Sequence, residues 1–154
     1  MIDDIAVIAM PMRFGDGECV FLEKESETAL FLIAEGSIRI TKQDSSRRSR
    51  EITVIPAGSV CGEMSLLAGM ARSCSGYAVN DVMVYKITRV AFYDLLNRDN
   101  AAAHKMLLGL CELMGGRMRI MDEQMVQLLD RQDAETHQPE MADLRDKLFN
   151  EWAF

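Results

Sequence analysis

The hydrophobic pattern of the chain changes once, near Thr88, and this change constrains the fold more than any other feature. Between residues 5 and 88, apolar residues come in short runs that turn signals such as Glu35-Gly36 and Asn80-Asp81 separate. After Thr88, apolar residues recur every three or four positions over a much longer stretch. Short runs between turns are typical of strands, and the second spacing is typical of helices. The sequence therefore predicts a β-rich body followed by helices.

Seven short segments of the first part are predicted as strands: residues 5–9, 19–22, 29–34, 37–41, 51–55, 77–79 and 82–88. In residues 37–41 and 51–55, apolar and polar side chains alternate, as expected for a sheet with one buried face. Seven or more short strands separated by tight turns favour a closed sandwich or a jelly roll (double-stranded β-helix). The segment 44–50 carries three arginines and is predicted as a solvated hairpin loop.

The second part is predicted to hold a short helix and then a long one. Thr88 can cap a helix over Arg89–Asn97, and Asp99 or Asn100 can begin a helix that reaches about Gln132. Seven apolar residues of the long helix alternate spacings of four and three, the pattern of a coiled coil. They are Leu107, Cys111, Met114, Met118, Met121, Met125 and Leu128. One small barrel cannot cover so long a stripe, so we predict a homodimer through it, with packing on its own barrel as the alternative.

These patterns divide the chain into a barrel with a short helix (1–99), a long helix (100–133) and a tail (134–154). The pair Gly115-Gly116 in the long helix allows either a close helix approach or a hinge. The end of the tail predicts a short amphipathic helix with apolar residues on one face. They are Met141, Leu144, Leu148 and Trp152, with Phe149 beside them. We expect this helix to fold back on the body or on a partner subunit, and docking to a different protein effector is the alternative.

Composition excludes several classes of protein. The net charge of −7 argues against a dedicated nucleic-acid binder. No apolar run approaches the ~20 residues of a membrane span, and the acidic N-terminus is unlike a signal peptide. The four cysteines (Cys19, Cys61, Cys74 and Cys111) form no CxxC pair, and with only two histidines no metal site is predicted. We therefore expect a cytoplasmic protein in a reducing setting.

The segment CGEMSLLAGMARS, residues 61–73, is almost wholly apolar or small, yet it carries Glu63 and Arg72. A short helix over residues 64–67 would offer backbone N–H groups to an anion. Arg72 supplies a planar charged fork suited to phosphate, and Glu63 an acceptor suited to a sugar hydroxyl. The phosphate ester of a ribose would satisfy both. A structural Glu63–Arg72 salt bridge, or two solvated side chains, is the alternative.

This segment, extended to CGEMSLLAGMARSCS, resembles the phosphate-binding cassette of the cyclic nucleotide-binding domain family. Gly62-Glu63 and Arg72 stand at the family's spacing, and the apolar positions are filled. Residues 14–40 are similar to the family's first strands, residues 55–58 to the turn before the cassette, and residues 84–96 to the last strand and following helix. The resemblance covers about residues 7–130. Cys61, Ala71, Cys74 and Ser75 depart from the family pattern.

The resemblance implies a jelly roll of eight strands that holds cAMP or cGMP, with cAMP favoured. It implies that Glu63 accepts the ribose 2′-hydroxyl and that Arg72 pairs with the cyclic phosphate. Ser73 would add a hydroxyl contact, as in bacterial catabolite-activator proteins. Backbone N–H groups around Met64 and Ser65 would complete the phosphate cradle, and Gly62 would permit the close approach.

The resemblance also implies that the long helix closes over the base of the nucleotide. A loose alignment brings Met121 and Asp122 near that point. Met121 could stack on the purine, and the carboxylate of Asp122 could accept from either adenine or guanine. A solvated Asp122 is the alternative.

We therefore expect a non-enzymatic regulatory receptor whose ligand is a cyclic nucleotide and which needs no other cofactor. A degenerate domain that dimerises without nucleotide is the main alternative. A transcription regulator is less favoured, because the 22 residues after Gln132 are too few for a winged helix-turn-helix. A cupin-type enzyme is also less favoured, because His104 and His137 both lie outside the predicted strands.

Overall fold

The computed structural model describes residues 2–135, and the predicted tail helix lies outside them. The chain divides into two compact units, Met1–Leu110 and Cys111–Phe154. The first unit contains a β-barrel with three short helices and the first turns of a long helix. The second contains the rest of that long helix. The proposed boundaries at residues 99 and 133 stay a prediction.

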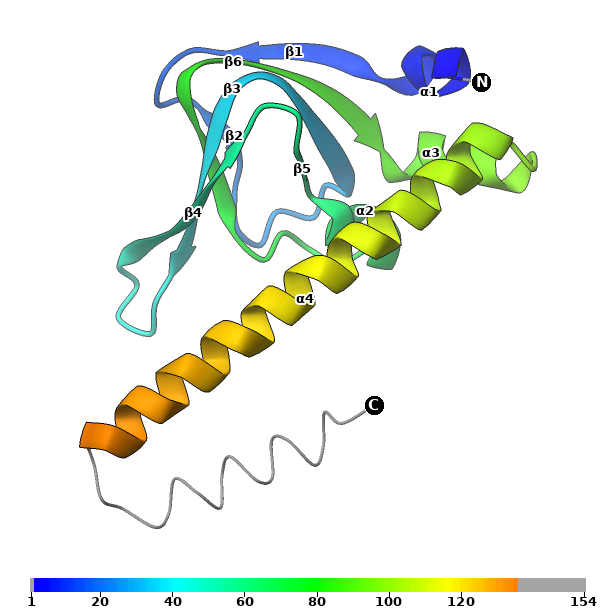
Figure 1. The fold of residues 1–154 in the computed structure, drawn as a ribbon. Coiled ribbons are helices and arrows are strands. Elements are labelled where there is room, and N and C mark those ends of the chain that lie inside the picture. Colours follow the sequence, from blue (N-terminus) through cyan, green and yellow to red (C-terminus); the bar gives the residue numbers. More distant parts are fainter. Residues whose placement is uncertain (1, 136–154) are drawn as a thin grey trace. The chain divides into compact units, whose positions relative to one another are not determined.

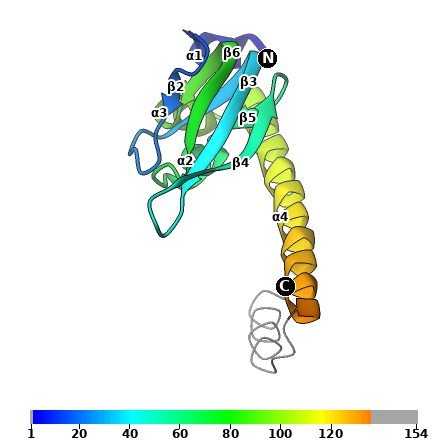
Figure 2. The same ribbon diagram turned by 90° about the vertical axis from the view of Figure 1, so that its left-hand side faces the viewer.

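The described residues contain one antiparallel sheet of six strands, built around two long ones, β3 (Ala29–Gln43) and β6 (Ser75–Thr88). These two pair along almost their whole length, from Ala29 opposite Thr88 to Thr41 opposite Ser75. β6 also pairs with β1 (Met10–Phe14) and β2 (Cys19–Phe21), and β3 also pairs with β4 (Ser49–Pro56) and β5 (Val60–Cys61). Figure 1 shows the strands curling round a common interior, and Figure 2 shows β6, β3 and β4 next to one another. The predicted jelly roll is confirmed.

The strand count differs from the prediction of about eight, because two expected breaks are bends within continuous strands. The pairing of β3 shifts register on both sides of Glu35, without ending. Gly36 has a φ of 75°, and a Cβ there would collide with the carbonyl oxygen of Asp81. Asn80, opposite this bend, has a φ of 60°. The Glu35-Gly36 and Asn80-Asp81 turn signals therefore mark a bend that β3 and β6 share. The short strands β1 and β5 were not predicted from the sequence.

The predicted strand at residues 5–9 is wrong, because this segment is part of helix α1 (Ile2–Ile8). In a strand, Ile5, Val7 and Ala9 would share one face. In the structure Ile5 and Ile8 pack against the helical core, and Val7 is 85% exposed. A spacing of three residues fits a helix, so the helical period governs this segment.

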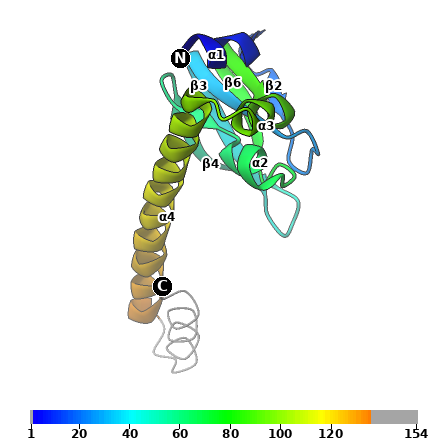
Figure 3. The same ribbon diagram turned by 90° about the vertical axis from the view of Figure 1, so that its right-hand side faces the viewer.

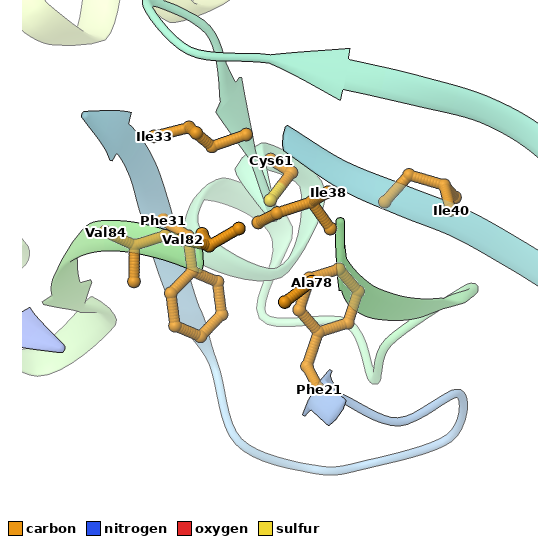
Figure 4. Packing of buried hydrophobic residues seen from close by; sticks show 9 residues of the cluster. All are labelled: Phe21, Phe31, Ile33, Ile38, Ile40, Cys61, Ala78, Val82 and Val84. Carbon is orange, nitrogen blue, oxygen red and sulfur yellow. The ribbon is translucent and has the colours of Figure 1, made fainter. Parts of the chain in front are cut away.

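Two hydrophobic cores hold the first unit together, one on each side of β3. The interior core consists of Phe21, Phe31, Ile33, Ile38, Ile40, Cys61, Ala78, Val82 and Val84, and Figure 4 shows these side chains converging inside the barrel. The helical core consists of Leu30, Leu66, Ile87, Phe92, Ala103 and Leu110. Because successive side chains of a strand point to opposite faces, Leu30 serves the helical core while Phe31 serves the interior. The short helices and the first turns of the long helix are therefore packed into the first unit.

Helix α3 (Arg89–Asn97) begins and ends where the sequence predicts. The side chain of Thr88 accepts a hydrogen bond from the backbone N–H of Ala91 at 3.3 Å, which satisfies one of the unpaired donors at the helix start. Helix α2 (Glu63–Ala68) also lies where a short helix is predicted, with one more residue at each end. Both predictions are confirmed.

Helix α4 (Ala101–Glu135) is the long helix, and it runs through Gly115-Gly116 without interruption. The side chain of Asn100 accepts hydrogen bonds from the N–H groups of Ala102 and Ala103, at 3.0 and 3.1 Å, and so caps it. Residues of the first turns of the helix, among them Ala103 and Leu110, are buried in the helical core.

The predicted dimer stripe divides between the two units. Leu107 belongs to the first unit and packs, half-buried, against the helical core, as the alternative prediction requires for this residue. Within the second unit, Met114 is half-buried and Cys111 is exposed. The remaining members, Met118, Met121, Met125 and Leu128, are between 52% and 64% exposed. These four residues therefore form an exposed apolar surface on the part of α4 that belongs to the second unit.

The arginine-rich segment 44–50 is the turn between β3 and β4 and the start of β4. The carboxylate of Asp44 accepts hydrogen bonds from the N–H groups of Ser46 and Arg48 and from the side chain of Arg50, each at 2.9 Å. The arginines are exposed. The segment is thus a solvated loop organised by one aspartate.

Candidate functional site

The segment with the lone acid and base forms a loop and a short helix between β5 and β6. The chain leaves β5 at Cys61, passes through Gly62 and enters α2. Gly62 has a φ of 88°, and a Cβ there would lie 2.5 Å from the carbonyl oxygen of Ala29 and closer still to Nη1 of Arg72. Only glycine fits this turn, and its backbone therefore lies directly against the guanidinium of Arg72.

The loop between β2 and β3 fixes the backbone of Arg72. Its N–H donates to the carbonyl oxygen of Glu25 at 2.9 Å, and its carbonyl accepts from the N–H of Lys24 at 2.8 Å. The side chain of Ser75 accepts a hydrogen bond from the N–H of Glu23 at 2.8 Å. Three neighbouring contacts thus hold the end of the cassette in place.

The guanidinium of Arg72 lies over two aromatic rings inside the barrel. Its Cζ is 4.9 Å from the ring centre of Phe21 and 5.1 Å from that of Phe31. The rings stack on each other, with centres 5.6 Å apart and planes 13° apart. The negative faces of the rings stabilise the cation, but an aromatic face does not replace the hydrogen-bond acceptors of its N–H groups.

Arg72 is only 4% exposed, yet its Nε, Nη1 and Nη2 have no hydrogen-bond partner among the described residues. A buried cation without acceptors is unfavourable, because it has lost its water without replacement. Burial accordingly lowers the pKa of Arg72. These N–H groups are suited to bind a buried anion. None of them is hydrogen-bonded to Glu63.

The other predicted cassette residues lie along α2 and the loop after it. Glu63 begins α2 and is 9% exposed. Ser65 is buried, and its hydroxyl donates to the carbonyl oxygen of Met70 at 2.7 Å. Met64 is 42% exposed, and Ser73 is exposed as well. The structure thus places Gly62 against a buried arginine, with a buried carboxylate next in the chain.

The residues that depart from the family pattern lie in different surroundings. Cys61 is buried in the interior core, and Cys74 is half-buried against the same core. Burial raises the pKa of the Cys74 thiol. Ala71 is exposed. All four cysteines lie in the described residues and none forms a disulfide.

Met121 and Asp122, the predicted contacts to the base, lie on α4 within the second unit, and both are exposed. Their closure over the base stays a prediction. Among the described residues, no three His, Cys, Asp or Glu side chains are grouped so that they could hold a metal ion. Within the same part of the chain, no helix combines the length and the apolar character needed to cross a membrane.

The sequence did not reveal what supports the site. Phe21 and Phe31 belong to predicted strands and read as ordinary core residues, and the arginine that contacts them is more than forty positions away. Residues 24–25 contact Arg72 through backbone atoms, and no side-chain pattern in the sequence predicts such contacts. Only folding brings these groups together.

Residues 11–99, more than half of the chain, match the family described as the cyclic nucleotide-binding domain. The chain belongs to this family. The match spans the barrel, the cassette and α3.

Three relatives illustrate the similarity. The chain is 29% identical over 120 residues to the cyclic AMP receptor protein of Thermus thermophilus, covering 77% of this chain and 54% of that protein. It is 25% identical over 122 residues to a cGMP-dependent protein kinase of Caenorhabditis elegans, covering 79% of this chain and 15% of that protein. The crystal structure of the Thermus thermophilus catabolite activator protein is similar with a TM-score of 0.70 and 25% identity, over 83% of this chain and 60% of that one. The chain thus spans about half of the first relative and a small part of the kinase.

Proposed function

We propose that this protein binds a cyclic nucleotide in the cassette and acts as a non-enzymatic regulatory sensor. One observation carries the proposal: the guanidinium of Arg72 is buried, has no hydrogen-bond partner among the described residues, and lies between a glycine turn and two stacked phenylalanines. A cyclic phosphate would supply both the charge and the acceptors that this guanidinium lacks.

The remaining cassette residues take roles that fit their positions. Glu63 accepts the ribose 2′-hydroxyl, and the backbone N–H groups of Met64 and Ser65 face the phosphate. Gly62 permits the close approach, since a Cβ there would collide with Arg72. The exposed hydroxyl of Ser73 adds a contact from the rim.

We favour cAMP over cGMP as the ligand. The support is that the relative named for cyclic AMP is 29% identical to this chain, whereas the kinase named for cGMP is 25% identical. Met121 and Asp122 of α4 cover the base in this proposal. The four cysteines without disulfides are consistent with a reducing, cytoplasmic compartment.

In this proposal the long helix transmits the signal, and two copies of the chain form a homodimer through its apolar stripe. Met118, Met121, Met125 and Leu128 follow the heptad spacing and are exposed in the single chain. A second copy of the same helix would bury them in a coiled coil. A protein effector then responds to the conformational change of the helix pair or of the tail.

Titration calorimetry of the purified protein with cAMP and with cGMP tests the proposal. We expect binding, and we expect Arg72→Ala to weaken it by about 2–4 kcal/mol, the scale of a lost charged pair. Arg39→Ala is the control, because Arg39 is an exposed arginine of the same barrel that lies between two buried isoleucines of β3. No heat from either nucleotide at near-millimolar concentration would leave the alternative, a degenerate domain that dimerises without nucleotide.

A further inference from the structure

The second end of the cassette helix α2 is fastened to α3 by two side chains. A helix leaves its last carbonyl groups without partners inside the helix. In α2 the carbonyl oxygens of Leu66 and Leu67 accept hydrogen bonds from Nη1 of Arg89, at 2.6 and 2.7 Å. The hydroxyl of Tyr93 also donates to the oxygen of Leu67, at 2.8 Å. Figure 3 shows α2 and α3 on the same side of the barrel.

The surroundings of Arg89 fix its direction. Its Cζ lies 4.3 Å from the centre of the Tyr93 ring, one helical turn further along α3. Gly69, which ends α2 with a φ of 66°, lies on the other side, and a Cβ there would be 3.3 Å from the same Cζ. The backbone N–H of Arg89 donates to the carbonyl oxygen of Thr28 at 2.9 Å. The guanidinium is therefore held between a ring and a glycine, in a position to bind α2.

Apolar packing runs directly beneath these hydrogen bonds. Leu66 of α2 is fully buried in the helical core, together with Phe92 of α3 and Ala103 of α4. All of these residues belong to the first unit. The C-terminal end of α2 is thus joined to α3 through both polar and apolar contacts, so a displacement of one helix must break these contacts or move the other.

We propose that Arg89 and Tyr93 are positioning residues that couple the cassette helix to α3. They fix the end of α2 opposite to the Gly62 turn, so a gain of order in α2 becomes a gain of order in α3. The ligand-dependent part rests on the proposed function, since there the nucleotide supplies the order. The coupling itself exists without ligand, because its contacts are present in the chain alone.

Hydrogen exchange of the unliganded protein gives the first test. Arg89→Met removes the donors but keeps an apolar side chain, so we expect amides of residues 63–70 to exchange about tenfold faster. Tyr93→Phe removes one neutral hydrogen bond, and we expect an increase of about threefold. Arg89→Lys, which keeps the charge, should restore part of the protection. The control is Arg98→Met directly after the same helix, since Arg98 is exposed and pairs with Asp94 at 2.8 Å.

Exchange at saturating cAMP gives the second test. We expect the nucleotide to protect both α2 and α3 in the parent protein, and to protect α2 alone in Arg89→Met. An unchanged exchange rate of residues 63–70 in unliganded Arg89→Met would overturn the inference, and so would an undiminished response of α3 in that variant. If Arg89→Met does not fold, Tyr93→Phe decides both tests. Failure of the parent protein to bind cAMP or cGMP would overturn the proposed function instead, and the unliganded test would then decide the inference alone.

Discussion

An arginine that lies on an aromatic ring is found at each end of the cassette helix α2, and the two arginines differ in their partners. The guanidinium of Arg72 lies on Phe21 and Phe31 and has no hydrogen-bond partner among the described residues. Arg89 lies on Tyr93 and donates to two carbonyl oxygens of α2. The same chemical group is therefore unsatisfied at one end and satisfied at the other.

This difference separates a binding role from a structural one. A buried guanidinium without acceptors destabilises the unliganded protein, and an anion that supplies acceptors removes the penalty. A guanidinium that already binds helix carbonyls stabilises the fold and gains nothing from a ligand. In the proposed function the ligand therefore binds at the unsatisfied end, and the satisfied end holds α2 to the rest of the domain.

The largest effect on stability is expected at the turn that carries the unsatisfied end. Gly62→Ala must place a Cβ against the Ala29 carbonyl at a positive φ, so we expect the free energy of unfolding to fall by about 2–4 kcal/mol. Gly58→Ala is the matched control, because Gly58 has a φ of 82° but nothing within 4 Å of its Cβ position. It should lose only about 1 kcal/mol. Equal losses in denaturant unfolding would show that the turn is not tightly packed.

The second prediction sets the two arginines directly against each other. In the absence of nucleotide, Arg72→Met removes an unpaired buried charge, so we expect the free energy of unfolding to rise by about 1 kcal/mol. Arg89→Met removes satisfied hydrogen bonds, so we expect a fall of about 1–3 kcal/mol. Urea unfolding of both variants measures the signs. A loss of stability in both would contradict the contrast between the ends.

The smallest effect concerns Cys74, which is half-buried two residues after Arg72. Burial raises the pKa of its thiol, and the charge of Arg72 partly opposes that rise. Arg72→Met should therefore raise this pKa further and move the pH profile of Cys74 alkylation to higher pH, because the thiolate is the reactive form. Arg89→Met should leave the profile where it is. Mass spectrometry of labelled peptides measures the pH profile of Cys74 alkylation. Identical profiles for the two variants would show that the charge of Arg72 does not affect the Cys74 thiol.

Local signals in the sequence were sufficient for the helices near the site. Thr88 as a cap, the start and end of α3, and the short helix α2 were all predicted, since capping and helical spacing act over a few residues. The strands were harder. Two predicted breaks became a bend shared by β3 and β6, because pairing partners more than forty residues apart kept both strands continuous. Ile5 and Ile8 were assigned to a strand because so short an apolar run does not distinguish the two periods.

By itself the sequence singled out Gly62, Glu63 and Arg72 as candidate ligand contacts, from their type and spacing together with the resemblance to the family. Only the tertiary structure decided that the guanidinium of Arg72 lies on Phe21 and Phe31 without an acceptor from the described part of the chain, while Arg89 is bound to α2. The physical reason is that satisfaction of a buried charge depends on groups that are distant along the chain and adjacent only after folding.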